Sequence, residues 1–250
     1  MTNEIAKLFS LEGKAAVITG ASRGIGEEIA RVFALAGARV VMNSRKEKGI
    51  REAADKIKAN GGEALPVVGN VSSSEDRKKL INASMEWAGR IDILVNNAGY
   101  HQRGLAEEIG VADLGKMVDV NLKAPMLISK AIFRKMIQAK SGQIINILSM
   151  SPKLCVVGDS VYAATKSGLE AFSRVLNKEG HPFGVHVNNI GLSAFPSGML
   201  EQIIGSDPEK VLNLIPHKQF APLKEIIAAI EFFETNSNDI GGQTLFFGGV

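Results

Sequence analysis

Cysteine is nearly absent from this sequence of 250 residues, and its scarcity excludes an internal disulfide because Cys155 has no second cysteine to pair with. A single cysteine fits a reducing compartment and favours a cytoplasmic location. Metal-ligand spacing is absent as well, so we predict no metal site and expect the histidines in loops or on the surface. The four histidines are His101, His181, His186 and His217.

Long apolar runs and a strong charge of either sign are also missing. No segment approaches the ~20 apolar residues that a membrane-spanning helix needs. Residues 1–14 hold no apolar run that would indicate a signal peptide or an anchor. The 29 basic and 26 acidic residues give a formal net charge of +3 and are spread along the chain. We therefore expect no binding to nucleic acid or membrane.

The residues that are present are typical of one globular domain covering 1–250. Hydrophobic residues make up 45% of the chain, enough for a large core, and no repeat or linker divides it. Short apolar runs alternate with segments of helical periodicity, which predicts an α/β fold around a parallel sheet. We expect strands at 15–19, 39–43, 63–68, 91–95, 144–148, 185–190 and 242–247. We expect helices at 27–36, 48–60, 74–88, 111–139, 160–171 and 226–234.

A glycine-rich loop separates the first expected strand from the first expected helix. It contains Gly20, Gly24 and Gly26. Glycines let the backbone approach phosphate groups, and a helix N-terminus offers free N–H groups and the positive end of a dipole. Three glycines alone are a weak signal, but the order strand, loop, helix predicts a site for a dinucleotide.

A second candidate site lies between Ser149 and Lys166. Tyr162 and Lys166 are four residues apart, so on a helix they share one face. An ammonium group beside a phenol favours the phenolate and lowers the tyrosine pKa from about 10, which suits a general acid or base. Ser149 follows an expected strand, at the edge where open α/β sheets bind ligands. A solvated helix face is the plain alternative, and the glycine loop upstream argues against it.

Combined, these motifs resemble the short-chain dehydrogenase/reductase family over residues 11–249. The glycine loop has the spacing T-G-x-x-x-G-I-G, and Tyr162 with Lys166 forms Y-x-x-x-K downstream. The other matching positions are Asn96, Asn97, Ala98, Gly99, Asn121 and Ser149. The resemblance implies a Rossmann-type three-layer doubly wound fold with a seven-stranded parallel sheet in the order 3-2-1-4-5-6-7. It also implies a substrate lid at about 195–219.

The resemblance implies an oxidoreductase acting on CH–OH or C=O groups, with Asn121, Ser149, Tyr162 and Lys166 as catalytic residues. NADPH would deliver hydride to a ketone while Tyr162 protonates the developing alkoxide. Ser149 would orient the carbonyl oxygen. Lys166 would lower the tyrosine pKa and hold the nicotinamide ribose. Asn121 would mark a local break in helix 111–139, whose freed carbonyl holds a water near the lysine.

The end of the second strand indicates which cofactor binds. NAD-binding proteins carry an acidic residue there, whereas this chain has Asn43, Ser44, Arg45 and Lys46. Arg45, with Arg23 in the glycine loop, is placed to bind the 2′-phosphate of NADP. The alternative is two unrelated surface cations. The expected cofactor contacts are Gly20, Ser22, Arg23, Gly24, Ile25, Gly26, Ser44, Arg45, Asn70, Val71, Asn97, Ala98, Gly99, Tyr162, Lys166, Leu192 and Ser197.

Three features depart from the family pattern or leave a role open. Leu192 and Ser193 replace the usual Pro-Gly turn, with Ser197 in place of a threonine. Asn70 replaces the usual aspartate beside the adenine. The turn at 96–99 has either a structural role or a direct cofactor contact. Candidate substrate-pocket residues are mostly apolar, which suggests a partly hydrophobic ketone: Tyr100, His101, Met150, Leu154, Val156, Phe195 and Met199.

Two other functions are compatible with this pattern. A 3-oxoacyl-[acyl-carrier-protein] reductase is the specific enzymatic alternative. A non-catalytic NADP-binding sensor is the other, and the intact catalytic set argues against it. The expected partners are a small ketone or alcohol and further copies of the chain, as a homotetramer or homodimer. The helices carrying Asn121 and Tyr162 have excess apolar residues for such an interface: Leu122, Met126, Ile132 and Phe172.

Overall fold

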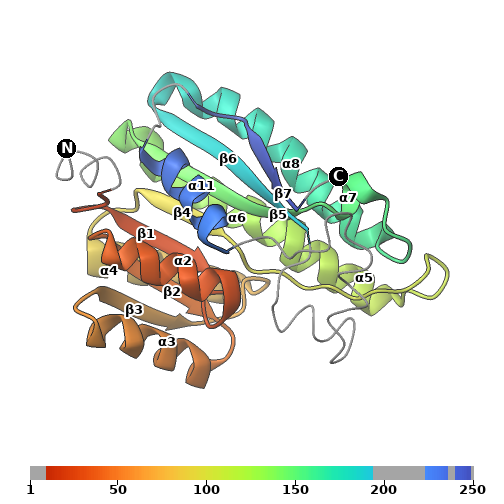
Figure 1. The fold of residues 1–250 in the computed structure, drawn as a ribbon, viewed down its shortest axis with the longest axis horizontal. Coiled ribbons are helices and arrows are strands. Elements are labelled where there is room, and N and C mark those ends of the chain that lie inside the picture. Colours follow the sequence, from red (N-terminus) through yellow and green to blue (C-terminus); the bar gives the residue numbers. More distant parts are fainter. Residues whose placement is uncertain (1–9, 194–222, 236–239, 249–250) are drawn as a thin grey trace.

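The fold is a single seven-stranded parallel sheet with helices on both faces (Figure 1). The computed structural model describes residues 10–193, 223–235 and 240–248. The strands are β1 Ala15–Thr19, β2 Arg39–Ser44, β3 Glu63–Val68, β4 Ile93–Asn96, β5 Gly142–Ser149, β6 Val185–Leu192 and β7 Thr244–Phe247. Their order is β3-β2-β1-β4-β5-β6-β7, which confirms the fold class and the strand order predicted from the sequence.

The helices connect these strands and form the two outer layers. They are α2 Gly24–Leu35, α3 Glu47–Ala59, α4 Ser74–Ala88, α5 Val111–Val118, α6 Ala124–Ala139, α7 Ser151–Leu154, α8 Ser160–Gly180 and α11 Leu223–Thr235. A π-helical segment, η1 Asp119–Lys123, joins α5 to α6, and a short 3-10 turn, η2 His181–Phe183, follows α8. In the described residues no helix is long and apolar enough to cross a membrane.

Each face of the sheet has its own hydrophobic core, because successive residues of a strand point to opposite faces. On β1, Ala16 and Ile18 pack against α2, α3 and α11, whereas Val17 packs against α4, α6 and α8. All five residues of β1 are buried. The unbroken apolar run in the sequence therefore reflects a strand that is covered on both faces.

The segment 111–139 is helical along its whole length, as the sequence predicts, and it contains the local break at Asn121 that the family resemblance implies. It is divided into α5, the π-helical segment η1 and α6, with Asn121 inside the π-helical part. A π turn widens the helix by one residue and is typical of functional sites. Asparagine is a poor residue for the interior of an α-helix, and its position in the π segment explains its presence here.

Three asparagines form a buried polar ladder across neighbouring strands. Asn96 Nδ2 donates to Asn146 Oδ1 at 2.8 Å, and Asn146 Nδ2 lies 3.3 Å from Asn189 Oδ1. The ladder is bonded to both helices on that face, because Asn96 donates to Ser129 of α6 and Asn146 donates to Ser173 of α8. These polar bonds fix α6 and α8 over the strands that end at the site.

Replacing Asn146 by alanine should lower the free energy of unfolding by at least ~2 kcal/mol, because the change leaves its buried partners without a hydrogen bond. Urea denaturation followed by circular dichroism measures the change. The matched control is Asn82→Ala on the exposed face of α4, which should change stability by less than about 0.5 kcal/mol. Equal effects of the two substitutions would contradict the role of the ladder.

Candidate active site

The predicted site residues lie where parallel strands end at one edge of the sheet. The glycine loop follows β1, the turn at 96–99 follows β4, and Ser149 is the last residue of β5. In parallel sheets this edge carries the ligand site. The topology therefore brings three stretches that are distant in the sequence to a single edge.

The glycine loop is shaped so that the backbone itself lines a cradle. Gly20 and Gly24 have positive φ angles of 68° and 60°, which glycine adopts without strain. A Cβ on Gly20 would lie 2.8 Å from the Ala98 Cα, and a Cβ on Gly26 would meet the Asn97 side chain. Helix α2 begins at Gly24, and no side chain caps its first turn. Its free N–H groups can therefore bind an anion such as a pyrophosphate.

Asn97 has a structural role in this cradle. Its Nδ2 donates to the carbonyl oxygens of Thr19 and Gly20, at 2.9 and 3.0 Å. In return, the Thr19 hydroxyl accepts from the backbone N–H groups of Asn97 and Ala98, both at 3.1 Å. Of the two roles left open for the turn at 96–99, these contacts establish the structural one.

Hydroxyl and guanidinium groups gather at the end of β2. Ser44 Oγ donates to Ser22 Oγ at 2.9 Å, which ties the end of β2 to the glycine loop. Arg23 and Arg45 are both exposed, and among the described residues neither forms an ion pair. Asn43 is buried, and its amide donates to two backbone carbonyls at the end of β3. The position where NAD-binding proteins carry an acidic ribose ligand is thus near a buried amide that is bonded to the backbone.

The segment after β3 uses its polar groups for its own turn. Asn70 Oδ1 accepts from the Ser72 N–H at 3.1 Å, and the Asn70 N–H donates to Asp76 at 2.8 Å. Val71 is buried in the core beneath this turn. The predicted contacts of Asn70 and Val71 with an adenine stay a prediction.

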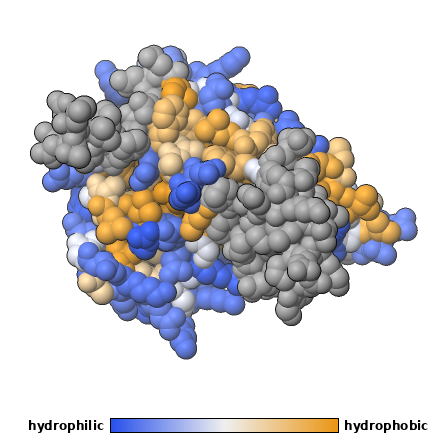
Figure 2. All heavy atoms as spheres, in the orientation of Figure 1, coloured by the Kyte–Doolittle hydropathy of each residue, from blue (hydrophilic) through white to orange (hydrophobic). Residues whose placement is uncertain are grey.

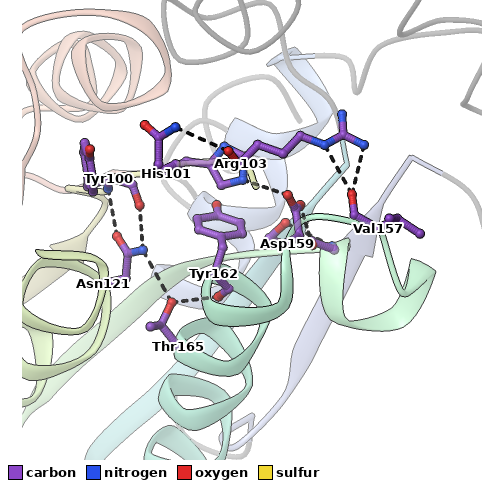
Figure 3. A network of polar contacts seen from close by, with 11 residues as sticks. Tyr100, His101, Arg103, Asn121, Val157, Asp159, Tyr162 and Thr165 are labelled. Atoms are coloured by element: carbon purple, nitrogen blue, oxygen red, sulfur yellow. Dashed lines mark hydrogen bonds and ion pairs between the residues drawn. The ribbon is translucent and has the colours of Figure 1, made fainter. Parts of the chain in front are cut away.

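Tyr162 extends from the first turn of α8 between the π-helical segment and the loop that carries His101 (Figure 3). Part of the residue is exposed, but burial of its phenol raises the pKa of Tyr162 to about 12. A hydrogen bond with Ser149 lowers the pKa, and the charge of Asp159 raises it again. The direction is opposite to the lowering that the sequence predicts, because desolvation outweighs the favourable contacts.

Lys166 lies below the phenol on the same face of α8. Its Nζ donates to the carbonyl oxygen of Ile147 at 2.8 Å and lies 5.7 Å from the centroid of the Tyr162 ring. Burial lowers the pKa of Lys166 to about 8. Among the described residues, its Nζ bonds to the Ile147 carbonyl alone. The ammonium is beside the tyrosine, as the four-residue spacing predicts, but burial governs the pKa of both groups.

Asn121 is almost fully buried and clamps the strand-end loop to two helices. Its Oδ1 accepts from the Tyr100 N–H at 2.8 Å, and its Nδ2 donates to the Tyr100 carbonyl at 2.7 Å. The same Nδ2 lies 3.4 Å from Thr165 Oγ1 on α8. The side chain is therefore fully used in positioning, so any part in a proton relay would have to come from the backbone.

Sequence reasoning missed a buried histidine–aspartate pair beside Tyr162. His101 Nε2 lies 2.9 Å from Asp159 Oδ1, and Ser151 Oγ donates to Asp159 Oδ2 at 2.7 Å. The His101 ring packs edge-on against Tyr162, with 4.5 Å between centroids. The expectation that the histidines lie in loops or on the surface holds for His101, which lies in a loop although its side chain is buried. It is wrong for His186, which lies on β6 and is 3% exposed. Asp159 lies only three residues before Tyr162, a spacing that could have signalled its proximity.

The remaining predicted positions divide into described and undescribed residues. Leu192 ends β6 and is buried, and its carbonyl accepts from the Met150 N–H at 2.7 Å. Leu154 is 39% exposed. The expected lid segment 195–219, with Phe195, Ser197 and Met199, lies outside the described residues. Within the described part, no group of three potential ligands is placed to hold a metal ion.

Comparison with known proteins agrees with this geometry. The family model described as short chain dehydrogenase matches residues 14–206. A 3-oxoacyl-[acyl-carrier-protein] reductase from Synechocystis sp. is 34% identical over 240 residues, which cover 95% of this chain and 96% of that protein.

Two solved structures have nearly the same fold along their whole length. A gluconate 5-dehydrogenase from Burkholderia cenocepacia J2315, in complex with NADP and tartrate, is 29% identical with a TM-score of 0.90, covering 98% of this chain and 97% of that one. A 7α-hydroxysteroid dehydrogenase, complexed with NADH and a 7-oxo bile acid, is 27% identical with a TM-score of 0.91, covering 98% and 96%. From the cradle, the tyrosine–lysine helix and these matches, we conclude that this chain belongs to the short-chain dehydrogenase/reductase family of oxidoreductases.

Proposed function

We propose that this chain is an NADPH-dependent carbonyl reductase that converts a ketone to an alcohol with Tyr162 as the general acid. The observation that carries the proposal is the arrangement of Ser149, Tyr162 and Lys166 at the sheet edge that also holds the glycine cradle. A hydroxyl, a phenol and an amine thus lie at the same edge as a loop suited to a dinucleotide.

The cradle and the buried amine both fit a nicotinamide cofactor. Glycines at 20 and 26 let the loop pack directly against Ala98 and Asn97, and the first turn of α2 has free N–H groups for a phosphate. Lys166 has three hydrogens to donate and bonds to one acceptor among the described residues, so it can also hold ribose hydroxyls. Bound NADPH would supply the hydride to the carbonyl carbon.

The protonation state of Tyr162 suits reduction. With its pKa raised to about 12, the phenol carries its proton at neutral pH and can transfer it to a developing alkoxide. The Ser149 hydroxyl, at the end of β5, would hydrogen-bond the carbonyl oxygen and orient it. Asn121 holds the loop and α8 in place, and its own carbonyl in the π turn would hold a water for reprotonation.

The two exposed arginines support a preference for NADP over NAD. Arg45 and Arg23 flank the end of β2, where an acidic residue would read the ribose of NAD. A guanidinium binds a phosphate with charge-assisted, bidentate hydrogen bonds. Related structures contain either NADP or NADH, so the choice rests on these residues.

A second candidate function is 3-oxoacyl-[acyl-carrier-protein] reduction, which the 34% identical relative favours. The catalytic groups would be the same, and the partner would be an acidic carrier protein. A non-catalytic sensor is disfavoured, because a pure binder needs no buried phenol paired with a serine. We also propose a cytoplasmic location, which suits a protein with one exposed free thiol at Cys155.

We further infer assembly as a homotetramer or homodimer. Two of the four apolar residues expected at the interface pack within the protomer instead. Ile132 is fully buried, and Leu122 packs on Gly168 of α8. Other apolar side chains are exposed, including Val175 on α8 and Leu245 on the edge strand β7. Figure 2 shows apolar residues gathered over the part of the face where Figure 1 draws β7. An exposed apolar edge strand presents unpaired backbone groups on which another chain can pair.

Tyr162→Phe should lower the turnover of ketone reduction at least ~10²-fold, because the general acid is lost. NADPH affinity, measured by nicotinamide fluorescence, should change little. The pH dependence gives a second measure in the reverse direction. Alcohol oxidation needs the phenolate, so its rate should rise with pH by up to ~10-fold per unit below the pKa. That slope should vanish in the variant. Near-normal turnover of Tyr162→Phe would refute the mechanism.

Arg45→Asp should weaken NADPH binding at least ~30-fold, because it removes a favourable charge and adds a repulsive one beside the 2′-phosphate. NADH should bind equally well or better, since a carboxylate can accept from its ribose hydroxyls. The measurement is a pair of titrations with each cofactor, with Arg134→Asp on the exposed face of α6 as the control. A wild type that prefers NADH, or a variant that loses both cofactors equally, would argue against NADP.

Light scattering at micromolar concentration should give the mass of a dimer or tetramer. Leu245→Lys should shift the mass toward the monomer if β7 forms the contact, because a buried lysine at an interface is costly. Val111→Lys is the matched control, since Val111 is 87% exposed at the start of α5. A wild type that scatters as a monomer would exclude the assembly.

A further inference from the structure

The wall of the site beside Tyr162 contains a polar group that the proposed chemistry does not use. His101 follows the turn after β4, and its side chain is 4% exposed. Its Nε2 contacts Asp159, while its Nδ1 is buried and has no hydrogen-bond partner among the described residues. A buried nitrogen without a partner is costly in a folded protein, so it points to a ligand that is bound in use.

Asp159 determines which nitrogen of His101 carries the hydrogen. Burial raises the pKa of this carboxyl, but the hydrogen bonds from His101 and Ser151 outweigh it, and the net pKa is below its ordinary value. The carboxylate is therefore ionised and only accepts hydrogen bonds. Ser151 Oγ donates to one oxygen, and His101 Nε2 must donate to the other. In the neutral ring, Nδ1 is then an acceptor.

The position of His101 links this acceptor to the reacting carbonyl. Its ring packs edge-on against the Tyr162 ring at 4.5 Å between centroids, and Figure 3 shows both residues beside Asp159. A molecule whose oxygen meets the Tyr162 phenol therefore has its neighbouring atoms close to the imidazole. The negative charge behind the ring disfavours an anionic group there, whereas a neutral hydroxyl can donate to Nδ1.

A purely structural role for the pair is weakened by other contacts between the same loops. Arg103 Nε and Nη2 donate to the Val157 carbonyl at 3.3 and 3.1 Å, and the Gly104 N–H donates to the Gly158 carbonyl at 3.1 Å. These bonds join the loop after β4 to the loop before α8 without His101. The imidazole is thus not needed to hold the loops together.

We propose that His101 Nδ1 accepts a hydrogen bond from a hydroxyl on the carbon next to the reacting carbonyl, so that the site selects α-hydroxyketones. The inference rests on the proposed reduction at Tyr162 and specifies the substrate class of the same site. In this role His101 is a substrate-recognition residue, and Asp159 with Ser151 fixes its tautomer.

The test compares two probe ketones of the same size, 1-hydroxybutan-2-one and pentan-3-one, which differ by a hydroxyl in place of a methyl group. The wild-type protein with NADPH should prefer the hydroxyketone at least ~10-fold in kcat/KM, because only its hydroxyl satisfies the buried acceptor. Equal values for the two probes would overturn the inference and leave the reductase function intact. No reduction of any ketone in a broad panel would instead refute the reductase function.

Two substitutions of His101 separate its two nitrogens. His101→Gln places an amide where Nε2 contacts Asp159 and leaves no acceptor at the Nδ1 position, so the ratio of kcat/KM for the two probes should fall to within ~2-fold of one. His101→Asn places an amide oxygen near the Nδ1 position, so it should retain a larger preference than His101→Gln. A preference that is unchanged in His101→Gln, or smaller in His101→Asn, would overturn the assignment.

A spectroscopic measurement tests the tautomer without any turnover. In protein with ¹⁵N-labelled histidine at about pH 9, where an ordinary imidazole is neutral, His101 should show a protonated Nε2 and an unprotonated Nδ1. Its signals are identified by their loss in His101→Gln. Asp159→Asn should weaken this preference between tautomers, because an amide can also donate. A protonated Nδ1 in the wild type would overturn the proposed acceptor role even if the enzyme reduces ketones.

Discussion

The hydrogen bonds between Asn97 and the end of β1 are the interaction on which the site depends. They satisfy the carbonyl oxygens of Thr19 and Gly20 at the point where the chain leaves the sheet. The amide also fills the space that a Cβ on Gly26 would need. The first turn of α2 is therefore fixed relative to β4, and with it the N–H groups that face an anion. A cofactor cradle made of backbone needs such support, because its own glycines provide no packing.

Exclusion of water determines the charges at the other half of the site. Burial raises the pKa of Tyr162 to about 12 and lowers the pKa of Lys166 to about 8, so both groups are shifted toward their neutral forms. A protonated phenol is the state that the proposed reduction requires of its proton donor. In the proposed mechanism Lys166 would then act mainly through position and hydrogen bonding, whereas the sequence pattern predicts control of the tyrosine pKa through charge.

The strand order was predicted correctly from the resemblance to the family, whereas the proximity of Tyr162 and Lys166 was predicted from their four-residue spacing. Tyr162 and Lys166 share a helix face by periodicity, and the glycine loop follows from its position after an apolar run. The π turn around Asn121 was not predicted as an element, since apolar periodicity continues on either side of it. The direction of the tyrosine pKa shift depends on burial by distant segments, which no local pattern reports. The contact between His101 and Asp159 joins positions 58 residues apart and is equally invisible in the sequence.

The polar wall beside Tyr162 shows how such a fold can vary its specificity without altering its chemistry. The loops after β4 and before α8 are joined by backbone and Arg103 contacts, so the side chains they carry are free to differ. Here they carry a buried imidazole and a carboxylate next to Tyr162. A desolvated hydrogen-bonding group discriminates between substrates more strongly than an added methylene does. Because His101 and Asp159 lie outside the catalytic set, the wall can select a substrate while Ser149, Tyr162 and Lys166 keep the same geometry.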